Sequence, residues 1–309
     1  MRVTHGFISP DGPCALTIGN FDGLHRGHLA MLEKLKREAS ARALPTCVLT
    51  FEPHPREFFN PAQAPARLTS LGEKAELLKT AGIDRLHVFR FNKAFASLSP
   101  EGFIEQALVN TLHARWILVG DDFRYGTKRA GDFNLLQSLG NRYGYEAEHL
   151  PTVTVDGIRS SSTAVREALA EGNMDKAAQL LGRPYSISGR VIHGDKLGRT
   201  IGFPTANIQL RHNRPPLTGI FAVEVCGIDS TPLQGVSSLG VRPTIKANGR
   251  PTLEAYIFNF DRELYGQKLH VDFLKKLRDE EKYPDLPSLI AQINRDVDNA
   301  KSFFASRHG

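Results

Sequence analysis

The sequence has little cysteine and no long apolar run, and each shortage excludes a class of protein. Three cysteines occur among 309 residues, and Cys14, Cys47 and Cys226 lie far apart. Their odd number and wide spacing fit neither a disulfide framework nor a zinc site, which is usual in a reducing compartment. No apolar run approaches the roughly 20 residues of a membrane span, and residues 1–10 carry no apolar signal core. We therefore expect a cytoplasmic protein without a membrane partner.

Two familiar phosphate-binding motifs are also absent from the first half. Without a Gly-x-x-x-x-Gly-Lys-Ser/Thr stretch this half is not a P-loop kinase, and without a Gly-x-Gly-x-x-Gly turn dinucleotide redox chemistry is disfavoured. The net charge of +6 and the pI near 9.2 could suggest nucleic acid, but lysine and arginine are spread along the chain. Lysine and arginine side chains that bind small polyphosphate substrates would explain the positive net charge equally well. We favour that interpretation and expect no nucleic acid partner.

The first half alternates short apolar runs with helical patterns. The alternation is typical of a parallel sheet with helices on both faces, a Rossmann-like doubly wound α/β fold. Ligands of such sheets bind beyond the carboxyl ends of the strands. The expected strands are residues 15–18, 46–51, 86–91, 116–119 and 146–150, and the expected helices are residues 27–41, 70–81, 99–113, 132–143, 163–170 and 173–181.

The pattern changes after residue 182, where β-rich runs are separated by Gly, Pro and Asn turns. Strands at this spacing predict an antiparallel barrel or a sandwich. Residues 287–304 carry apolar side chains at helical spacing and predict a closing helix. We expect two domains, residues 1–182 and 183–309. The expected strands of the second are residues 185–192, 219–225, 233–239, 253–260 and 268–273.

Residues 19–28 read Gly-Asn-Phe-Asp-Gly-Leu-His-Arg-Gly-His, between an apolar run and an amphipathic segment. Glycines let the backbone approach a ligand closely, and the first N–H groups of a helix favour an anion. His25 and His28 are three residues apart, so they share one face of a helix. We expect them to stabilise phosphate charge, although a tight turn that happens to hold two histidines is the alternative. The expected phosphate-binding residues here are Gly19, Asn20, Phe21, Asp22, Gly23 and Gly27.

Two further turns follow expected strands of the first half. Residues 51–55 contain two prolines and present His54, which could equally well cap its own loop. Residues 120–126 read Gly-Asp-Asp-Phe-Arg-Tyr-Gly, and acids at a strand end can bind sugar hydroxyls while nearby cations bind phosphates. An ordinary charged surface turn is the alternative for this second segment.

A serine-rich segment begins at Arg159 and leads into an expected helix. Ser162 or Thr163 would be the N-cap of that helix, and Arg166 lies one turn further on. A helix start flanked by arginines is also a second phosphate cradle. With a P-loop excluded, these groups favour attack of a substrate phosphate on the α-phosphate of ATP, which needs positioning and charge neutralisation more than a covalent nucleophile.

The second half has one stretch dense in glycine and polar residues, from 189 to 207. Its glycines predict a flap whose backbone wraps a phosphate chain. Thr205 and Asn207 alternate, so they point the same way on an extended chain, and their oxygens suit the Mg²⁺ carried by ATP. A tight turn with a polar face is the alternative. The expected phosphate-binding residues of this flap are Gly194, Lys196, Gly198 and Gly202.

Glu254 stands within an alternating β-run, Leu-Glu-Ala-Tyr-Ile-Phe. An acid in a barrel strand usually faces water. If it faces a ligand instead, it can take a proton from a primary alcohol that attacks the γ-phosphate of ATP.

These segments resemble known families. Residues 19–28 resemble the His-x-Gly-His signature of nucleotidylyltransferases. Together with residues 51–55, 120–126 and 161–166 they resemble the FAD synthetase half of the bacterial bifunctional riboflavin kinase/FAD synthetase. The second half resembles riboflavin kinase, most specifically in Pro-Thr-Ala-Asn at residues 204–207.

The resemblance implies a six-stranded barrel in the second half, Mg²⁺ held through Thr205 and Asn207, and Glu254 as the base. It implies that riboflavin is phosphorylated to FMN and that FMN is adenylylated to FAD, each with ATP. Arg166 is then expected to be catalytic beside His25 and His28. The expected flavin-binding residues are His54, Asp122, Phe123, Arg124, Arg159 and Arg278.

Two other functions remain open at this stage. A nucleotidylyltransferase for another substrate, such as phosphopantetheine, would leave the second half without a role. A flavin- or nucleotide-binding regulator without catalysis would have no need of the histidines, Thr205, Asn207 and Glu254. The sequence leaves the oligomeric state open.

Overall fold

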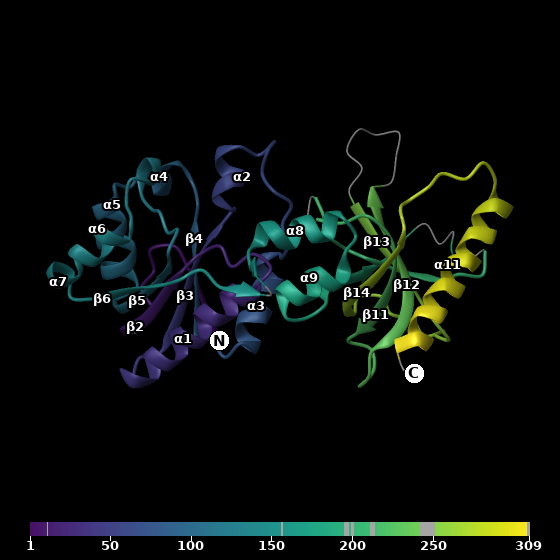
Figure 1. Ribbon diagram of the computed structural model, residues 1–309, viewed down its shortest axis with the longest axis horizontal. Coiled ribbons are helices and arrows are strands. Elements are labelled where there is room, and N and C mark those ends of the chain that lie inside the picture. The colour runs from purple at the N-terminus through teal and green to yellow at the C-terminus, as the bar shows by residue number, and fades with distance from the viewer. Residues whose placement is uncertain are drawn as a thin grey trace. The chain divides into compact units, whose positions relative to one another are not determined.

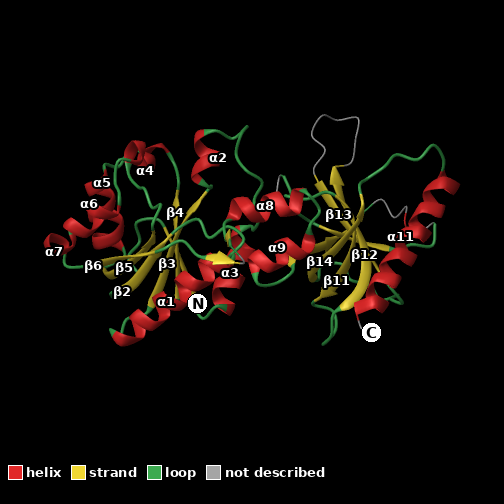
Figure 2. Cartoon of the chain, viewed as in Figure 1, coloured by secondary structure: helices red, strands yellow, loops and turns green. Residues whose placement is uncertain are grey.

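The computed structural model describes residues 1–10, 12–155, 157–194, 198, 201–210, 214–241 and 251–307. They form two compact units, the first made of Met1–Pro65 and Leu71–Ser161, the second of Ala66–Ser70 and Ser162–Gly309. Figures 1 and 2 show a sheet with helices in the first unit, and a barrel with a long C-terminal helix in the second.

The first unit is built on one parallel sheet of six strands in the order β1-β4-β3-β2-β5-β6. Its strands are β1 (Arg2–His5), β2 (Cys14–Ile18), β3 (Thr46–Glu52), β4 (Arg85–Arg90), β5 (Ala114–Gly120) and β6 (Glu146–Leu150), with a small hairpin of β7 (Thr154–Val155) and β8 (Ile158–Arg159). Its helices are α1 (Arg26–Ala41), α2 (Pro55–Phe59), α3 (Leu71–Thr80), α4 (Lys93–Ala96), α5 (Pro100–Phe103), the π-helix η1 (Ile104–Thr111), the 3-10 helix η2 (Thr127–Arg129), α6 (Phe133–Ser138) and α7 (Gly140–Tyr143).

The two faces of this sheet carry separate hydrophobic cores because strand side chains alternate between faces. Ala15 and Trp116 pack on one face beneath α1 and α3, while Leu16 and Ile117 pack on the other beneath η1 and α6. Helices thus cover both faces, as the doubly wound fold requires.

The direction of the chain across the sheet reverses between β2 and β5. From β2 the chain proceeds outward through β3 to β4, and it then resumes at β5 on the other side of β2. In open α/β sheets the ligand crevice lies beyond the carboxyl ends of the strands at this reversal. Residues 19–28 follow β2 at that place.

The second unit contains a closed antiparallel barrel in the order β10-β13-β12-β11-β14-β9, which selects the barrel over the sandwich. Residues such as Phe221, Leu253 and Phe273 fill its interior. The elements of this unit are α8 (Ser162–Ala170), α9 (Met174–Leu181), β9 (Tyr185–Ile192), β10 (Thr205–Ile208), β11 (Gly219–Cys226), β12 (Leu233–Val241), β13 (Pro251–Ile257), β14 (Lys268–Arg278) and α11 (Leu286–Arg307).

Helices cover the outside of the barrel in two places. Ala300 and Phe304 of α11 pack on Ala222 and Leu274 of the strands, so α11 is the closing helix that the sequence predicts. α8 and α9 join the barrel core through residues such as Leu180. These two helices therefore group with the second unit, although the expected boundary at residue 182 assigned them to the first. That boundary, as the limit of an independently folding domain, stays a prediction.

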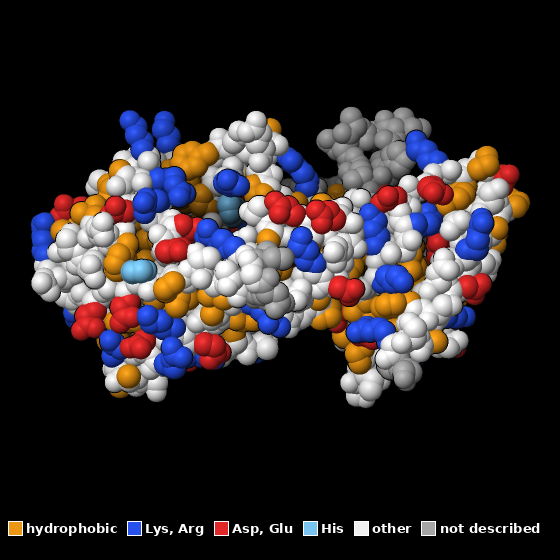
Figure 3. Space-filling view, in the orientation of Figure 1, with side chains coloured by type: hydrophobic (Ala, Val, Ile, Leu, Met, Phe, Trp, Pro, Cys, Tyr) orange, Lys and Arg blue, Asp and Glu red, His pale blue; other side chains and the backbone are white. Residues whose placement is uncertain are grey.

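No helix in the described ranges is long and apolar enough to span a membrane. On the face drawn in Figure 3, basic and acidic side chains both occur on each unit.

Candidate functional sites

The turn between β2 and α1 is held at both ends by hydrogen bonds. The Gly19 amide donates to the Leu49 carbonyl of β3 at 3.0 Å. At the other end His25 is the N-cap of α1, and its Nδ1 accepts from the His28 amide at 3.4 Å. Because Nδ1 is an acceptor here, the proton of a neutral His25 ring lies on Nε2.

The two histidines of the turn form a stacked pair. Their ring centroids are 3.7 Å apart with 22° between the planes, and the Phe21 ring lies 4.9 Å from the His28 ring at a tilt of 43°. Within the described part of the chain, His28 Nδ1 is buried without a hydrogen-bond partner. Burial, followed by the charges of His25 and Lys74, holds the pKa of His28 well below its ordinary value. The ring is therefore neutral at pH 7, and an approaching polyphosphate would favour its protonated form.

Gly27 is required by the close approach of Ser160. The Gly27 amide donates to Ser160 Oγ at 3.2 Å, and that hydroxyl lies 3.4 Å from His25 Nδ1. A Cβ at position 27 would stand 3.0 Å from the Ser160 carbonyl oxygen and 3.1 Å from the His25 ring. The segment before α8 thus touches the turn through Ser160, a residue that the sequence analysis did not select.

The interior of the turn is buried and strained. Asp22 and Phe21 are almost fully buried. Phe21 and Leu24 have φ values of 47° and 43°, which non-glycine residues adopt rarely. The side-chain oxygen of Asn20 is buried and lacks a partner among the described residues. A strained backbone with an unsatisfied acceptor is typical of functional sites.

The second expected phosphate cradle belongs to the second unit. Ser162 and Thr163 begin α8, and Arg166 Nε donates to the Ala66 carbonyl at 2.6 Å, all within the second unit. The part of these three residues in phosphate binding stays a prediction.

The expected flavin residues of the first unit stand after β3 and β5. His54 caps α2, with Nδ1 accepting from the Arg56 amide at 3.1 Å. Arg159 Nη2 makes an exposed 2.8 Å ion pair with Asp122. The Phe123 ring stacks on Tyr125, 5.2 Å between centroids. The capping interpretation of His54 is thus realised in the fold.

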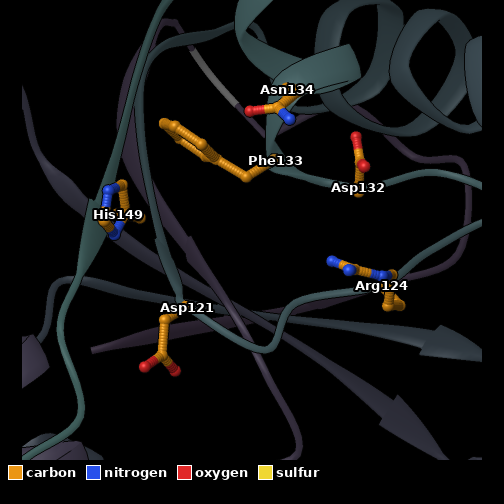
Figure 4. A pocket seen from close by; sticks show the side chains of 6 residues that line it. All are labelled: Asp121, Arg124, Asp132, Phe133, Asn134 and His149. Atoms are coloured by element: carbon orange, nitrogen blue, oxygen red, sulfur yellow. The ribbon is translucent and has the colours of Figure 1, made fainter.

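A hollow of 240 Å³ opens beside residues 120–126 (Figure 4). Arg124 and Asp132 stand on one side of it, and His149 of β6 stands across from them. Thr152 donates to Asp121 at 2.7 Å and, with the charge of Arg159, lowers the pKa of that carboxyl. The lining residues are Asp121, Arg124, Asp132, Phe133, Asn134 and His149.

In the second unit, β10 and β13 bring three expected site residues together. Asn207 pairs with Glu254 in the antiparallel register, and the Thr205 hydroxyl donates to Glu254 Oε2 at 3.3 Å. Asn207 Nδ2 donates to the Thr205 carbonyl at 3.4 Å. All three side chains are half-buried. The antiparallel register of β10 and β13 therefore places a carboxylate, a hydroxyl and an amide side by side.

Two glycines of the expected flap lie against these side chains. A Cβ at Gly194 would stand 2.5 Å from the side chain of Asn207, and one at Gly198 would stand 3.4 Å from Thr205 Oγ1 and would clash with the Phe203 carbonyl oxygen. Both positions therefore require glycine, Gly194 because of Asn207 and Gly198 because of the Phe203 carbonyl. Gly202 follows in a turn before β10. Lys196 lies outside the described residues.

Arg278, the last expected flavin residue, is held by the closing helix. Its Nε and Nη2 donate to the two oxygens of Asp296 in α11 at 2.8 and 2.7 Å, and the contact raises the pKa of the guanidinium. Gln292 donates to the same carboxylate at 2.9 Å. Arg278 is fixed in position by α11.

Comparisons with known proteins match both units. The FAD synthetase family model matches residues 8–164, and the riboflavin kinase family model matches residues 181–304. The bifunctional riboflavin kinase/FMN adenylyltransferase of Escherichia coli (strain K12) is 48% identical over 296 residues, which cover 96% of this chain and 94% of that protein. This chain belongs to the bifunctional riboflavin kinase/FMN adenylyltransferase family. The relative of the same name from Pseudomonas fluorescens is 46% identical over 305 residues, covering 99% and 97% of the two chains.

A solved structure supports the family fold. A crystal structure described as that of a macrolide-efflux protein from Streptococcus pneumoniae has a TM-score of 0.80 and 28% identity, over 96% of this chain and 97% of that one. The description applies to that protein, while the likeness concerns the fold.

The sequence motifs do not single out two buried residues near the turn between β2 and α1, Ser160 and Lys74. Ser160 stands in a run of three serines, so the motif marks its segment without singling it out. Lys74 has a clearer signal, because it occupies a position between Leu71 and Leu78 on the apolar face of its helix. A lysine in an apolar stripe is unusual in a surface helix.

Proposed function

We propose that this enzyme makes FAD from riboflavin in two ATP-dependent steps. The second unit transfers the γ-phosphoryl group of ATP to the 5′-hydroxyl of riboflavin and gives FMN and ADP. The first unit transfers the adenylyl group of another ATP to FMN and gives FAD and pyrophosphate. Family membership over both halves supports these activities. The convergence of Glu254, Thr205 and Asn207 in the same chain as the stacked histidines is the structural observation that carries the proposal.

In the kinase step Glu254 is the general base. Its carboxylate accepts the proton of the riboflavin hydroxyl as the hydroxyl oxygen bonds to the γ-phosphorus, and the bond to the ADP oxygen breaks. The contact with the Thr205 hydroxyl holds the carboxylate in one orientation. A base that is oriented in this way contributes about 10²–10⁴-fold to such reactions.

The residues around Glu254 fit magnesium that arrives with ATP. Hydroxyl and amide oxygens, as at Thr205 and Asn207, are hard ligands that suit this ion. Across the described ranges no group of three or more His, Cys, Asp or Glu residues could hold a metal ion by itself. A metal shared with the nucleotide needs no such cage. When bound, Mg²⁺ would neutralise charge on the transferred phosphoryl group.

In the adenylyl-transfer step the turn stabilises the negative charge that grows on the phosphates. A phosphate oxygen of FMN attacks the α-phosphorus of ATP, and pyrophosphate leaves. The Nε2 proton of His25, the His28 ring and the first N–H groups of α1 meet the growing negative charge. Arg166, Ser162 and Thr163 are expected to contribute a second set of phosphate contacts.

The flavin is proposed to lie beyond β3 and β5 in the first unit. The Phe123 ring, already stacked on Tyr125, offers a flat apolar face to the isoalloxazine ring. His54, Asp122, Arg124 and Arg159 are the proposed polar contacts. In the second unit Arg278, fixed by Asp296, is the proposed contact.

Domain limits, location and partners complete the proposal. We expect residues 1–182 and 183–309 to be the functional halves, acting in the cytoplasm without nucleic acid or membrane.

The decisive experiment is incubation of the full chain with riboflavin, ATP and Mg²⁺, with FMN and FAD separated over time. We expect FMN to rise first and FAD to follow. Accumulation of FMN without FAD would refute the role of the first unit, and absence of FMN would refute that of the second.

A further inference from the structure

The lysine at position 74 is one of the most completely buried large side chains of the chain. Only 1% of Lys74 is exposed, although it lies in α3, a helix whose other lysine, Lys79, faces solvent. Lysine is almost never buried to this degree unless it is paired, because removal of an ammonium group from water is unfavourable. The ammonium group is therefore expected to be held by specific contacts inside the fold.

Lys74 is linked to the turn of residues 19–28 through the hydroxyl group of Thr50. Its Nζ donates to Thr50 Oγ1 at 3.2 Å, and Thr50 Oγ1 donates to the Asn20 carbonyl at 3.3 Å. An ammonium group can only donate hydrogen bonds, so it forces the hydroxyl of Thr50 to point its own proton away. The proton then meets the Asn20 carbonyl. The ammonium group thus makes the Thr50 hydroxyl of β3 the donor in its hydrogen bond with the Asn20 carbonyl of the turn.

The turn needs support of this kind. Phe21 and Leu24 hold left-handed backbone conformations without being glycines. Such conformations persist only where the surrounding structure over-determines them. The Gly19 amide of the turn donates to the Leu49 carbonyl of β3. One residue further along each segment, the Thr50 hydroxyl donates to the Asn20 carbonyl. Two successive residues of β3 therefore anchor two successive residues of the turn.

Lys74 is also electrostatically coupled to the stacked histidines. Its charge is one of the causes that lower the pKa of His28. A fixed positive charge near the start of α1 adds to the field of the helix N-terminus, which already favours an anion. The Lys74 ammonium group therefore both supports the turn and helps to attract the polyphosphate.

On the basis of the adenylyl-transfer function proposed above, we propose that Lys74 is a positioning residue for the ATP triphosphate. Its buried ammonium group, acting through the Thr50 hydroxyl, holds residues 19–25 in the shape that receives the phosphates. Lys74 forms no bond with the substrate in this role, and no group is transferred to it.

The test compares four variants of the full chain. Lys74→Met keeps the length of the apolar stem and removes the charge, and Lys79→Met is the matched exposed control on α3. Thr50→Val removes the hydroxyl at nearly constant volume, and Thr50→Ser restores it. Initial rates of FAD formation from FMN and ATP give KM for each substrate and kcat. Riboflavin phosphorylation by the same samples is the internal standard.

We expect Lys74→Met to raise KM for ATP and to lower kcat/KM for ATP by about tenfold or more. Displacement of the residues that bind a substrate by about 1 Å can lower the rate by up to about 10²-fold. KM for FMN and the kinase rate should stay within about twofold of wild type, because neither depends on the turn. Thr50→Val should change KM for ATP in the same direction, whereas Thr50→Ser and Lys79→Met should resemble wild type. Lys74→Met with Thr50→Val should be no worse than Lys74→Met alone, because both act through one chain of contacts.

A merely structural role predicts a different result. Partial unfolding lowers kcat in proportion to the folded fraction and leaves KM for ATP unchanged, and that outcome overturns the proposal. Multiplicative losses in the double variant overturn it as well. If Lys74→Met fails to fold, the Thr50→Val and Thr50→Ser pair decides, and an unchanged KM for ATP in Thr50→Val overturns the proposal. A wild-type protein that forms no FAD overturns the proposed function itself, a result distinct from all of these.

Discussion

The rings of His25 and His28 stack with their centroids 3.7 Å apart, at the first turn of α1. Two imidazoles in van der Waals contact cannot both carry a full charge readily, because like charges disfavour each other's protonation. The pair is therefore suited to receive negative charge, and it becomes more basic as that charge arrives.

Removal of one ring should abolish one activity and spare the other. We expect His28→Ala to lower FAD formation from FMN by about 10²–10³-fold, the usual loss when one stabilising group of a transition state is removed. FMN formation from riboflavin should be unchanged. His5→Gln, an exposed histidine of the same unit, serves as control. Equal loss of both activities in folded His28→Ala protein would contradict separate sites.

The buried histidines should make stability depend on pH. Burial lowers the pKa of His28 and of His87, which is fully buried between Thr4 and the Gly6 carbonyl. The unfolded chain binds protons near the ordinary value of 6.5, whereas the folded chain does not. Their contribution is therefore complete above about pH 6.5 and is lost as pH falls through the lowered pKa values.

Urea unfolding midpoints between about pH 8 and pH 5 measure this loss. The midpoint should fall below about pH 6.5 in wild type, and the fall should be smaller in His87→Gln even though that variant is less stable. A midpoint constant over this range would show that neither histidine is held neutral.

Glu254, the proposed base of the kinase step, gives the prediction opposite to that for His28. We expect Glu254→Gln to lower FMN formation by about 10²–10⁴-fold, because the amide cannot accept the proton of the riboflavin hydroxyl. FAD formation from supplied FMN should stay at the wild-type rate. Glu263→Gln changes an exposed acid of the same unit and should change neither activity. Retention of FMN formation in Glu254→Gln would exclude Glu254 as the base.

The ion pair between Arg278 of β14 and Asp296 of α11 should contribute strongly to stability. Asp296 is almost fully buried and binds Arg278 through both oxygens. Removal of one partner of a buried pair leaves the other charge uncompensated, which costs about 3–5 kcal/mol. We expect Asp296→Asn to lower the unfolding free energy of the second unit by about this amount. Asp298→Asn, an exposed acid two residues further along α11, should leave the unfolding free energy unchanged. Chemical denaturation followed by the kinase activity measures both variants.

Much of the fold could be predicted from local patterns. The strands and helices that form around continuous apolar stretches, such as β2 and α1, were predicted with ends within about two residues. Besides the small hairpin of β7 and β8, two strands were missed, β1 and β10. β1 is a short, mostly exposed edge strand, and β10 spans only Thr205–Ile208. Neither has the apolar alternation that marks a half-buried strand, and each is defined by pairing with a partner distant in the sequence.

The helix expected at residues 99–113 illustrates a different limit. Ser99 and Pro100 begin it as predicted, with Ser99 Oγ accepting from the Gly102 amide at 3.0 Å. The chain then widens into the π-helix η1. Local capping chemistry determines where the helix starts, but packing of its buried face against the sheet determines how it is wound.

The sequence by itself determined that residues 19–28 form a glycine-rich turn before a helix, because glycines and a helix start act within a few residues. It also determined that Thr205 and Asn207 point the same way, since side chains alternate along a strand. Only the tertiary structure brought Ser160 against Gly27, Glu254 against Thr205, and Lys74 beneath the turn through Thr50. Those contacts join residues far apart in the chain. The apolar stripe of α3 marks Lys74 as unusual, but the stripe does not show that the ammonium group meets Thr50.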